Sequence, residues 1–282
     1  MSDLVEAMLV GSAQDGGVPQ AGCRCDTCAG VRRDPARRRL VASLALIDHA
    51  AGASWLVDAT PDFPRQLDLL AAHAPGCPLA GIILTHAHIG HYTGLIHLGR
   101  EVMGAVGMPL YATAPMGRFL TANGPWSQLV GLGNVSLRAL VPGEPVALSP
   151  RLAVTPVAVP HRAEFSDTIA VLAQGPRRRL FYCPDIDRWG QWEHTLPDFL
   201  TARDIALLDG TFYSGDELPG RNMAEIPHPP VVETVALLEG SGVSAGFIHL
   251  NHSNPLLHDG PERAWLAAQG HWAGREGMSW AL

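Results

Sequence analysis

The chain has 282 residues, of which 47% are hydrophobic and 17% are charged, and its formal net charge is −7. This length and composition predict a globular protein with a sizeable core and argue against a disordered chain. The acidic balance disfavours nucleic acid as the main partner, because phosphate binding needs a basic surface. No apolar run approaches the roughly 20 residues of a membrane span, so we expect no membrane partner.

The N-terminal stretch and the cysteines indicate the cellular compartment of the protein. The N-terminal stretch Met1–Glu6 is acidic and lacks the basic start of a signal peptide. Three of the five cysteines lie close together, at positions 23, 25 and 28. In a cytosolic chain such a cluster indicates a metal site rather than a disulfide framework. We therefore expect a cytoplasmic protein with a small-molecule substrate, and a homodimer is a possible assembly that nothing in the sequence demands.

Short apolar runs between glycines and prolines predict strands along the whole chain. In chain order they are Glu6–Gly11, Ser43–Asp48, Ser54–Asp58, Gly81–Thr85, Pro109–Ala112, Val135–Leu140, Leu152–Val159, Thr168–Ala173, Arg179–Cys183, Ile205–Asp209 and Ala245–Leu250. The expected helices are Asp62–His73 (after Thr60 as N-cap and Pro61 at the first position), Met116–Thr121, Val231–Glu239 and Pro261–Gln269. Because strands and helices mix throughout and no linker interrupts them, we predict a layered α/β sandwich in a single domain, residues 1–282.

Three histidines directly follow the apolar run 81–84, and they are the most informative feature of the chain. His86, His88 and His91 form the pattern H-x-H-x-x-H at the end of a predicted buried strand. Neutral imidazole is the commonest metal-binding side chain, and a short loop can aim several rings at one point. The pattern therefore predicts a metal centre at this strand end.

Further candidate ligands also lie where predicted strands end. His161 follows the run 157–160, Asp185 follows the run 180–184, and His249 follows the run 246–248. Rigid scaffolds commonly place chemistry where a strand gives way to a loop. Each residue alone has an ordinary structural explanation, but together with the histidine motif they predict one shared site.

This order of residues resembles the metallo-β-lactamase superfamily, whose motif is H-x-H-x-D-H followed by a distant His, an Asp and a last His. The resemblance implies a four-layer αββα sandwich with a metal site where the two sheets meet. It implies one ion on His86, His88 and His161. It implies a second ion on His91 and His249, with Asp185 bridging the two ions.

The chain departs from that motif at position 90, where Gly replaces the Asp and cannot coordinate a metal. One hypothesis is that the second ion is weakly bound or missing. The other is that another acid fills the gap. Asp15 is the first candidate, because the glycine-rich loop after the first strand reaches the site in the family it resembles, and Asp187 and Asp58 come second. The alternative for Asp15 is a structural role in its own turn.

The cysteine cluster supplies three thiolates, whereas a closed structural zinc site needs a fourth ligand. The arrangement is similar to that of the phosphodiesterases of phosphonate breakdown, in the same superfamily. Their zinc is closed by a His three residues beyond the last active-site His. The resemblance therefore implies a structural zinc on Cys23, Cys25, Cys28 and His252.

The chain also resembles the coenzyme PQQ synthesis protein B family in the stretches 11–20, 60–62 and 251–255. That resemblance implies the same fold and cysteine motif and a metal-dependent oxygenase acting on a tyrosine-derived precursor. The histidine motif of that family is altered at its second and third ligand positions, whereas this chain keeps all three histidines and lacks the Asp. The role of that family therefore does not carry over directly.

Three functions remain open from the sequence. The first is a metal-dependent hydrolase of a small phosphodiester or ester-type metabolite, acting through a metal-bound water, with Asp185, Asp15 and His228 as catalytic candidates and His228 as the proton donor. The alternative is that His228 is an ordinary histidine on a surface loop and not a proton donor. The second is a non-haem iron oxygenase that uses His91, His249 and Asp185. The third is an inactive metabolite-binding protein. The active-site metal could be Zn, Fe or Mn, as one ion or two.

Overall fold

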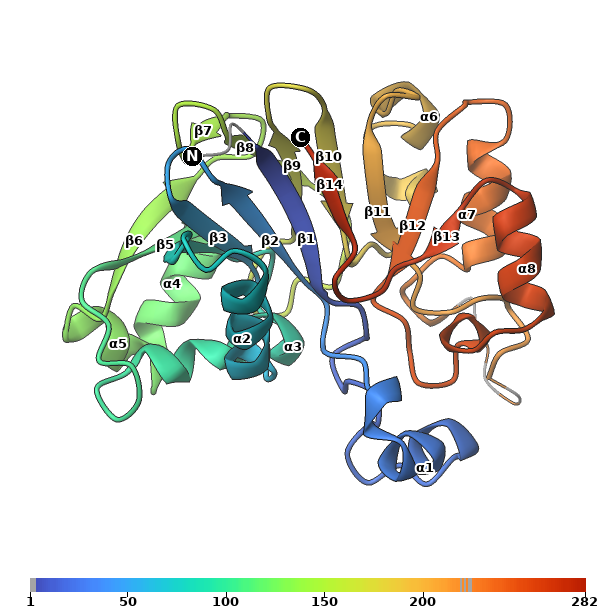
Figure 1. Cartoon of the computed structure of the whole chain (residues 1–282), viewed down its shortest axis with the longest axis horizontal. Coiled ribbons are helices and arrows are strands. Elements are labelled where there is room, and N and C mark those ends of the chain that lie inside the picture. The colour runs from blue at the N-terminus through green and yellow to red at the C-terminus, as the bar shows by residue number, and fades with distance from the viewer. Residues whose placement is uncertain (1–3, 219, 221, 223–224) are drawn as a thin grey trace.

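Two seven-stranded sheets lie face to face in the computed structural model, which describes residues 4–218, 220, 222 and 225–282 (Figure 1). The first sheet contains, in spatial order, β14 (Ser279–Ala281), β1 (Val5–Gly11), β2 (Ser43–Asp48), β3 (Ala53–Val57), β4 (Leu79–Ile83), β5 (Met108–Thr113) and β6 (Val135–Leu140). The second contains β13 (Trp272–Ala273), β12 (Ala245–Ile248), β11 (Ile205–Asp209), β10 (Arg179–Cys183), β9 (Ile169–Gln174), β8 (Ala153–Ala158) and β7 (Val146–Ala147).

The core between the sheets explains why the strands read as nearly continuous apolar runs. Leu9 and Leu44 of the first sheet belong to the same buried cluster as Leu180, Tyr182 and Leu207 of the second. Strands β3 to β6 pair in parallel, and so do β10 to β13. Parallel strands covered on both faces lack the alternation of polar and apolar residues that a half-exposed sheet has.

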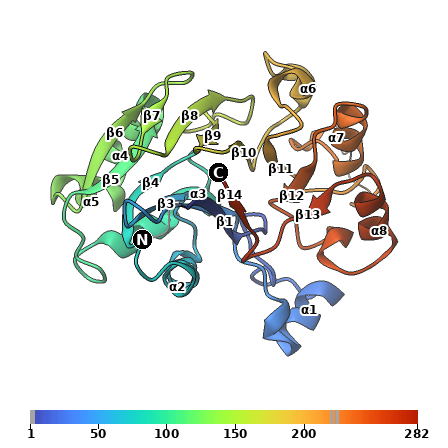
Figure 2. The same ribbon diagram turned by 45° about the horizontal axis from the view of Figure 1, so that its top comes forward.

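Helices cover the two outer faces of the sandwich (Figure 2). On the first sheet lie α2 (Phe63–His73), α4 (Ala114–Ala122) and α5 (Trp126–Gly131), and on the second lie α6 (Leu196–Phe199), α7 (Val231–Leu238) and α8 (Pro261–Ala268). The described part of the chain also contains α1 (Asp26–Arg33), α3 (Ile89–Tyr92) and the 3-10 turns Pro35–Arg37, Thr93–Leu98, Trp189–Gln191 and Pro255–Leu257. The predicted four-layer αββα sandwich is therefore confirmed.

Several local expectations need correction. Helix α2 begins at Phe63 with Asp62 as its cap position, and Thr60 accepts a hydrogen bond from the Asp62 amide instead of capping the helix. Helix α1 was not expected, because its residues read as a cysteine cluster. The Cys25 side chain accepts a hydrogen bond from the Cys28 amide and so caps this helix.

Two expectations concern the membrane and the N-terminus. Within the described ranges, no helix combines the length and the apolar character that a bilayer span requires. Residues 1–3, which belong to the stretch judged to lack a signal peptide, lie outside those ranges.

Candidate metal centre

The sheets bring the candidate residues to one edge. The motif histidines follow β4, and Asp185 and His249 follow β10 and β12. Two successive antiparallel pairings make β8 parallel to β10 and β1 parallel to β3, so His161 and Asp15 also follow carboxyl ends at this edge. Segments from both sheets thus meet at one place, as the sequence predicted.

Three histidines form a first group of converging nitrogens. Nε2 of His86 lies 2.9 Å from Nδ1 of His88, and that atom lies 3.2 Å from Nε2 of His161. Oδ1 of Asp185 lies 3.6 Å from the same nitrogen of His161. The group therefore presents three imidazoles and one carboxylate oxygen to a common point.

A second group consists of two histidines and two carboxylates. Oδ1 of Asp15 lies 3.2 Å from Nε2 of His91 and 3.4 Å from Nε2 of His249. Oδ2 of Asp185 lies 3.2 and 3.5 Å from the same two nitrogens. Ligand atoms about 2.0–2.1 Å from a tetrahedral zinc are separated by roughly 3.3 Å. The observed separations therefore match the edges of such a tetrahedron.

The four atoms of the second group are buried, and none has a hydrogen bond of acceptable geometry. They are Oδ1 of Asp15, Nε2 of His91, Oδ2 of Asp185 and Nε2 of His249. A buried polar atom without a partner is costly, and four of them aimed at one point need a shared partner. A divalent cation satisfies all four, so the residues present fit a metal ion. Asp185 faces each group with a different oxygen, as a bridging carboxylate does.

Asp15 occupies the space that the motif carboxylate would need. A Cβ added at Gly90 would overlap Oδ1 of Asp15 and would lie 2.7 Å from its Cγ. The glycine thus allows the loop after β1 to bring its own carboxylate to the place where the motif supplies one. This geometry agrees with the second of the two hypotheses for the gap, in which another acid, Asp15, takes the place of the missing one.

Asp58 and Asp187, the second choices for that gap, lie behind the histidines instead. Oδ2 of Asp58 accepts a hydrogen bond from Nδ1 of His91 at 2.7 Å, and Oδ1 of Asp187 accepts one from Nδ1 of His161 at 2.8 Å. Both acids therefore hold rings in place rather than join the cluster.

The outer nitrogens of the other rings are also engaged. The pairs are His86 Nδ1 with Thr85 Oγ1 at 3.0 Å, His88 Nε2 with Glu164 Oε2 at 3.1 Å, and His249 Nδ1 with Thr211 Oγ1 at 2.9 Å. Such partners fix the tautomer and orientation of a metal-binding histidine. No sequence pattern singled out Glu164, Asp209 or Thr211, although Asp209 ends a strand just as Asp185 follows one.

His228 lies beside the cluster rather than on an open surface loop. It is buried, and its Nδ1 lies 2.7 Å from Oδ2 of Asp209 and 4.0 Å from Oδ1 of Asp185. The other oxygen of Asp209 accepts the Thr211 hydroxyl that in turn supports His249. One carboxylate therefore orients both His228 and a candidate ligand.

Backbone strain is concentrated at this edge. Among the described residues, the non-glycine residues with positive φ are Asp58 (69°), His228 (148°) and His249 (59°). These conformations are uncommon for L-residues and persist where the surroundings require them, often at functional sites. All three belong to the cluster or to the residues that support it.

The electrostatics of the cluster suit a cation. Burial alone raises the pKa of Asp15 and Asp185, but the neighbouring histidines hold both well below the ordinary value, so both carboxylates are ionised. Burial lowers the pKa of His86, which is therefore neutral and able to coordinate. Burial also opposes protonation of His91, but Asp58 and Asp185 raise its pKa well above the ordinary value. The site thus attracts positive charge.

The cysteine cluster is a separate group. Nδ1 of His252 lies 3.7 Å from Sγ of Cys23 and 3.5 Å from Sγ of Cys25. Cys28 completes the set, and the four ligand atoms all lie within 4.8 Å of one another. Sulfur and nitrogen ligands of a tetrahedral zinc are separated by roughly 3.6 Å, so this donor set fits the expected ion.

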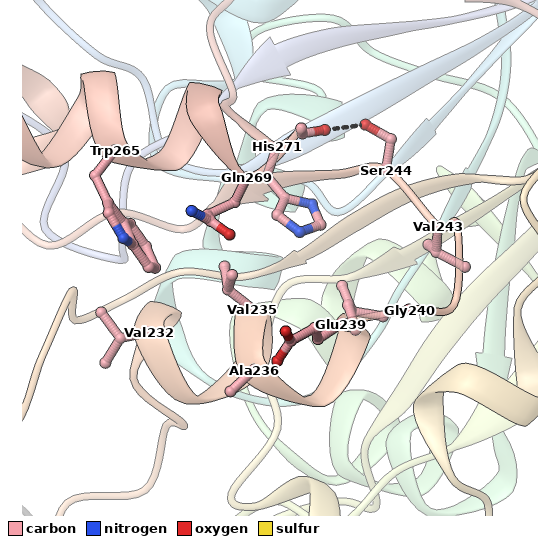
Figure 3. A pocket seen from close by; sticks show the side chains of 13 residues that line it. Val232, Val235, Ala236, Glu239, Gly240, Val243, Ser244, Trp265, Gln269 and His271 are labelled. Carbon is pink, nitrogen blue, oxygen red and sulfur yellow. Dashed lines mark hydrogen bonds between the residues drawn. The ribbon is translucent and has the colours of Figure 1, made fainter.

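A groove of about 710 Å³ lies elsewhere, between α7 and α8 (Figure 3). Val232 and Val235 form one wall, and Trp265 and Gln269 form the other. None of the candidate metal ligands lines it, so its size does not make it the reaction site.

Known proteins share both the sequence and the fold. The β-lactamase superfamily domain matches residues 54–249. Coenzyme PQQ synthesis protein B of Cupriavidus necator is 33% identical over 97% of this chain and 98% of that protein, and the same protein of Stutzerimonas stutzeri is 32% identical over 96% and 98%.

Solved structures agree with this relationship at the level of the fold. Zn²⁺-bound PqqB from Methylobacterium extorquens has a TM-score of 0.82 at 23% identity, covering 98% of this chain and 100% of that one. A diphosphatase of the PhnP family has a TM-score of 0.72 at 22% identity, covering 99% and 97%. The chain therefore belongs to the β-lactamase superfamily and, within it, to the family of coenzyme PQQ synthesis protein B.

Proposed function

We propose that the protein is a metal-dependent hydrolase that acts on a small phosphodiester or ester-type metabolite at a two-ion centre. The observation that carries the proposal is the carboxylate of Asp15 beside Gly90, 3.2 Å from His91 and 3.4 Å from His249. It restores to the second group an acid that the histidine motif lacks. A complete set with a bridging carboxylate suits hydrolysis, in which two ions stabilise the attacking and the leaving oxygen.

Each residue has a defined part in this proposal. One ion would be held by His86, His88 and His161, and the other by Asp15, His91 and His249, with Asp185 between them. When bound, the ions would lower the pKa of a water molecule and polarise the ester. Asp58, Asp187 and Asp209 keep the imidazoles oriented through hydrogen bonds at the outer nitrogens or, for His249, through Thr211.

His228 is the proposed proton donor. Hydrolysis joins the water oxygen to phosphorus or to the carbonyl carbon, and the departing oxygen needs a proton as its bond breaks. Nδ1 of His228 is engaged by Asp209, so Nε2 is the atom that would hold the proton for the departing oxygen. The ring lies beside both groups, with its centroid 5.5 Å from that of His161 and 5.8 Å from that of His249.

The second candidate function is that of a non-haem iron oxygenase, which the resemblance to coenzyme PQQ synthesis protein B implies. Its support is the 29–33% identity to proteins of that name over nearly the whole chain. In this candidate His91, His249 and a carboxylate would hold ferrous iron, which suits oxygen chemistry when coordination positions are open. The third candidate, an inactive binding protein, relied on Gly90, and the position of Asp15 removes that support.

The test has two measurements: hydrolysis by the zinc- or manganese-loaded protein in the absence of oxygen, and oxygen consumption by the iron-loaded protein. Zinc- or manganese-loaded protein should hydrolyse bis(p-nitrophenyl) phosphate under argon, and ferrous protein should consume no oxygen with the same substrate.

The His228→Gln variant should lose about 10²–10⁴-fold activity on a substrate with a poor alkoxide leaving group and far less on a substrate that releases p-nitrophenolate. His194→Gln, an exposed histidine away from the cluster, is the control. Equal losses on both leaving groups would refute the role of His228, and oxygen-dependent turnover alone would favour the oxygenase.

A further inference from the structure

Six arginines from four segments of the chain line a pair of adjoining hollows on the surface. They are Arg37, Arg38, Arg39, Arg65, Arg263 and Arg275. The two hollows, of about 510 and 440 Å³, share Ala36, Arg39 and Arg275. We call the pair the arginine groove. None of the candidate metal ligands lines it, so it is distinct from both metal clusters.

The arginine groove is positive on an otherwise acidic protein. The carboxylates that line it are Asp68, Asp259 and Glu276, so six guanidinium groups face three acids while the whole chain has a net charge of −7. Three of the arginines are consecutive, and Arg65, Arg263 and Arg275 join them from other segments although each added like charge costs electrostatic free energy.

Arg263 pairs with Oδ1 of Asp259 at 3.2 Å, but within the part of the chain that the structure describes the other guanidinium groups of the groove have no carboxylate within hydrogen-bond distance. Arg65 and Arg275 are exposed, and neither side chain has an ion pair or a hydrogen bond with any residue in the described ranges. Arg37 donates a hydrogen bond to Nδ1 of His258 at 2.9 Å, which is a ring nitrogen and not a carboxylate. Burial, together with Arg37 and Arg39, lowers the pKa of His258, so this ring favours its neutral form and accepts the hydrogen bond without offsetting the positive charge.

Arg39 is the inner end of the groove. Its side chain is only 12% exposed, and the one acid near it, Glu276, lies at 3.8 Å, beyond hydrogen-bond distance. Oε1 of Glu276 is already used by the amide of Leu40 at 2.9 Å and the hydroxyl of Ser12 at 3.0 Å. The largely buried guanidinium donates one hydrogen bond, to the carbonyl oxygen of Arg38 at 3.3 Å, and its other donors have no hydrogen-bond partner among the described residues.

We propose that the arginine groove is a second binding site, which takes a small polyanion with two or more phosphate groups. The planar guanidinium fork matches phosphate oxygens, and charge-assisted hydrogen bonds of this kind are the strong ones. The excess of three positive charges matches a diphosphate or triphosphate better than a singly charged anion. A hollow of 440–510 Å³ holds a metabolite but not a folded partner.

Occupation of the groove would also stabilise the segment that bears the cysteine cluster. His258, which accepts the hydrogen bond from Arg37, lies 3.0 Å from Oγ1 of Thr27 through its other nitrogen, and Thr27 belongs to α1. Bound polyanion should therefore slow hydrogen exchange in α1, because it fixes the arginines that flank this contact.

The test measures binding of inorganic pyrophosphate and tripolyphosphate to the metal-loaded protein by calorimetry, with orthophosphate and citrate alongside. We expect one pyrophosphate or tripolyphosphate per chain and weaker binding of orthophosphate and citrate. The double variant Arg65→Glu/Arg275→Glu should weaken binding at least tenfold. The matched control Arg177→Glu/Arg178→Glu makes the same charge change at exposed residues outside the groove and should shift affinity less than twofold. Polyphosphates withdraw metal from both variants alike, so the difference between them reports the groove.

A gain-of-affinity variant protects the test against simple misfolding. Glu276→Gln keeps an oxygen for the amide of Leu40 and the hydroxyl of Ser12 but removes a negative charge, so it should tighten pyrophosphate binding. The proposal is overturned if no polyphosphate binds below millimolar concentration. It is equally overturned if the double variant and its control bind pyrophosphate alike.

Discussion

Asp15 and Gly90 share one place in the structure, because a Cβ at position 90 would lie 2.9 Å from the Cα of Asp15 and would overlap its carboxylate. The acid that a motif histidine loop could supply comes here from the loop after β1. The two positions are therefore coupled, and exchanging their residues tests the proposed second metal site directly.

Asp15→Ala should lose one metal ion per chain, because it removes one of four atoms that converge at 3.2–3.5 Å. Gly90→Asp alone should destabilise the protein through the overlap, whereas Asp15→Gly/Gly90→Asp should recover most of the lost ion. Elemental analysis of dialysed proteins measures the metal content. Asp216→Ala, an exposed acid outside the cluster, is the control. An unchanged metal content in Asp15→Ala would contradict the assignment.

Asp58→Asn should weaken binding of the second ion by roughly 10–100-fold, since partners of the outer imidazole nitrogen commonly contribute that much. Asp58 is fully buried and holds Nδ1 of His91 at 2.7 Å. Asparagine tolerates the φ of 69° that this position requires, so the backbone should survive the change. Titration with a chelator-buffered metal series measures the affinity, and affinity equal to that of the unaltered protein would show that Asp58 does not act through His91.

Cys25→Ser should lose a different ion from the one that His88→Ala loses, and the double variant should lose both. Cys25 is exposed, so the loss of its thiol removes little packing. Cys77→Ser is the matched control, because that thiol is buried away from both clusters and its loss should lower the melting temperature without changing the metal content. Loss of the same ion in both single variants would mean that the two clusters are not independent.

Asp204→Asn should lower the free energy of unfolding by about 1–2 kcal/mol at pH 7. Burial raises the pKa of Asp204, but its contacts with Arg179 and Thr201 lower it below the ordinary value, so the carboxylate stays ionised in the fold. A lowered pKa stabilises the folded state above the ordinary value of about 3.9 and loses that effect as the pH falls through the folded pKa. Urea unfolding measures the free energy of unfolding of the unaltered protein and of Asp204→Asn. The difference between the two values should shrink below about pH 4. A difference in free energy of unfolding that stays constant down to pH 3 would contradict this account. Asp216→Asn, which removes an exposed acid, is the control.

The sequence by itself determined the layered fold and the composition of the candidate centre. Apolar runs of strand length and the residues at their ends were enough, because parallel strands carry their loops at one shared edge. His86, His88, His161, Asp185 and His249 could therefore be grouped before any coordinates were known. The resemblance to the motif H-x-H-x-D-H also indicated that an acid is missing at Gly90.

Tertiary structure alone decided which acid fills that gap and what the other acids do. The family resemblance ranked Asp15 before Asp58 and Asp187, but only the folded positions show that Asp15 faces the cluster and that the other two hold histidine rings from behind. Local periodicity cannot give the direction of a side chain across two sheets. Arg37, Arg38 and Arg39 are adjacent in sequence, but their convergence with arginines of three other segments is not visible there, because it depends on how the segments pack and no short-range pattern records that packing.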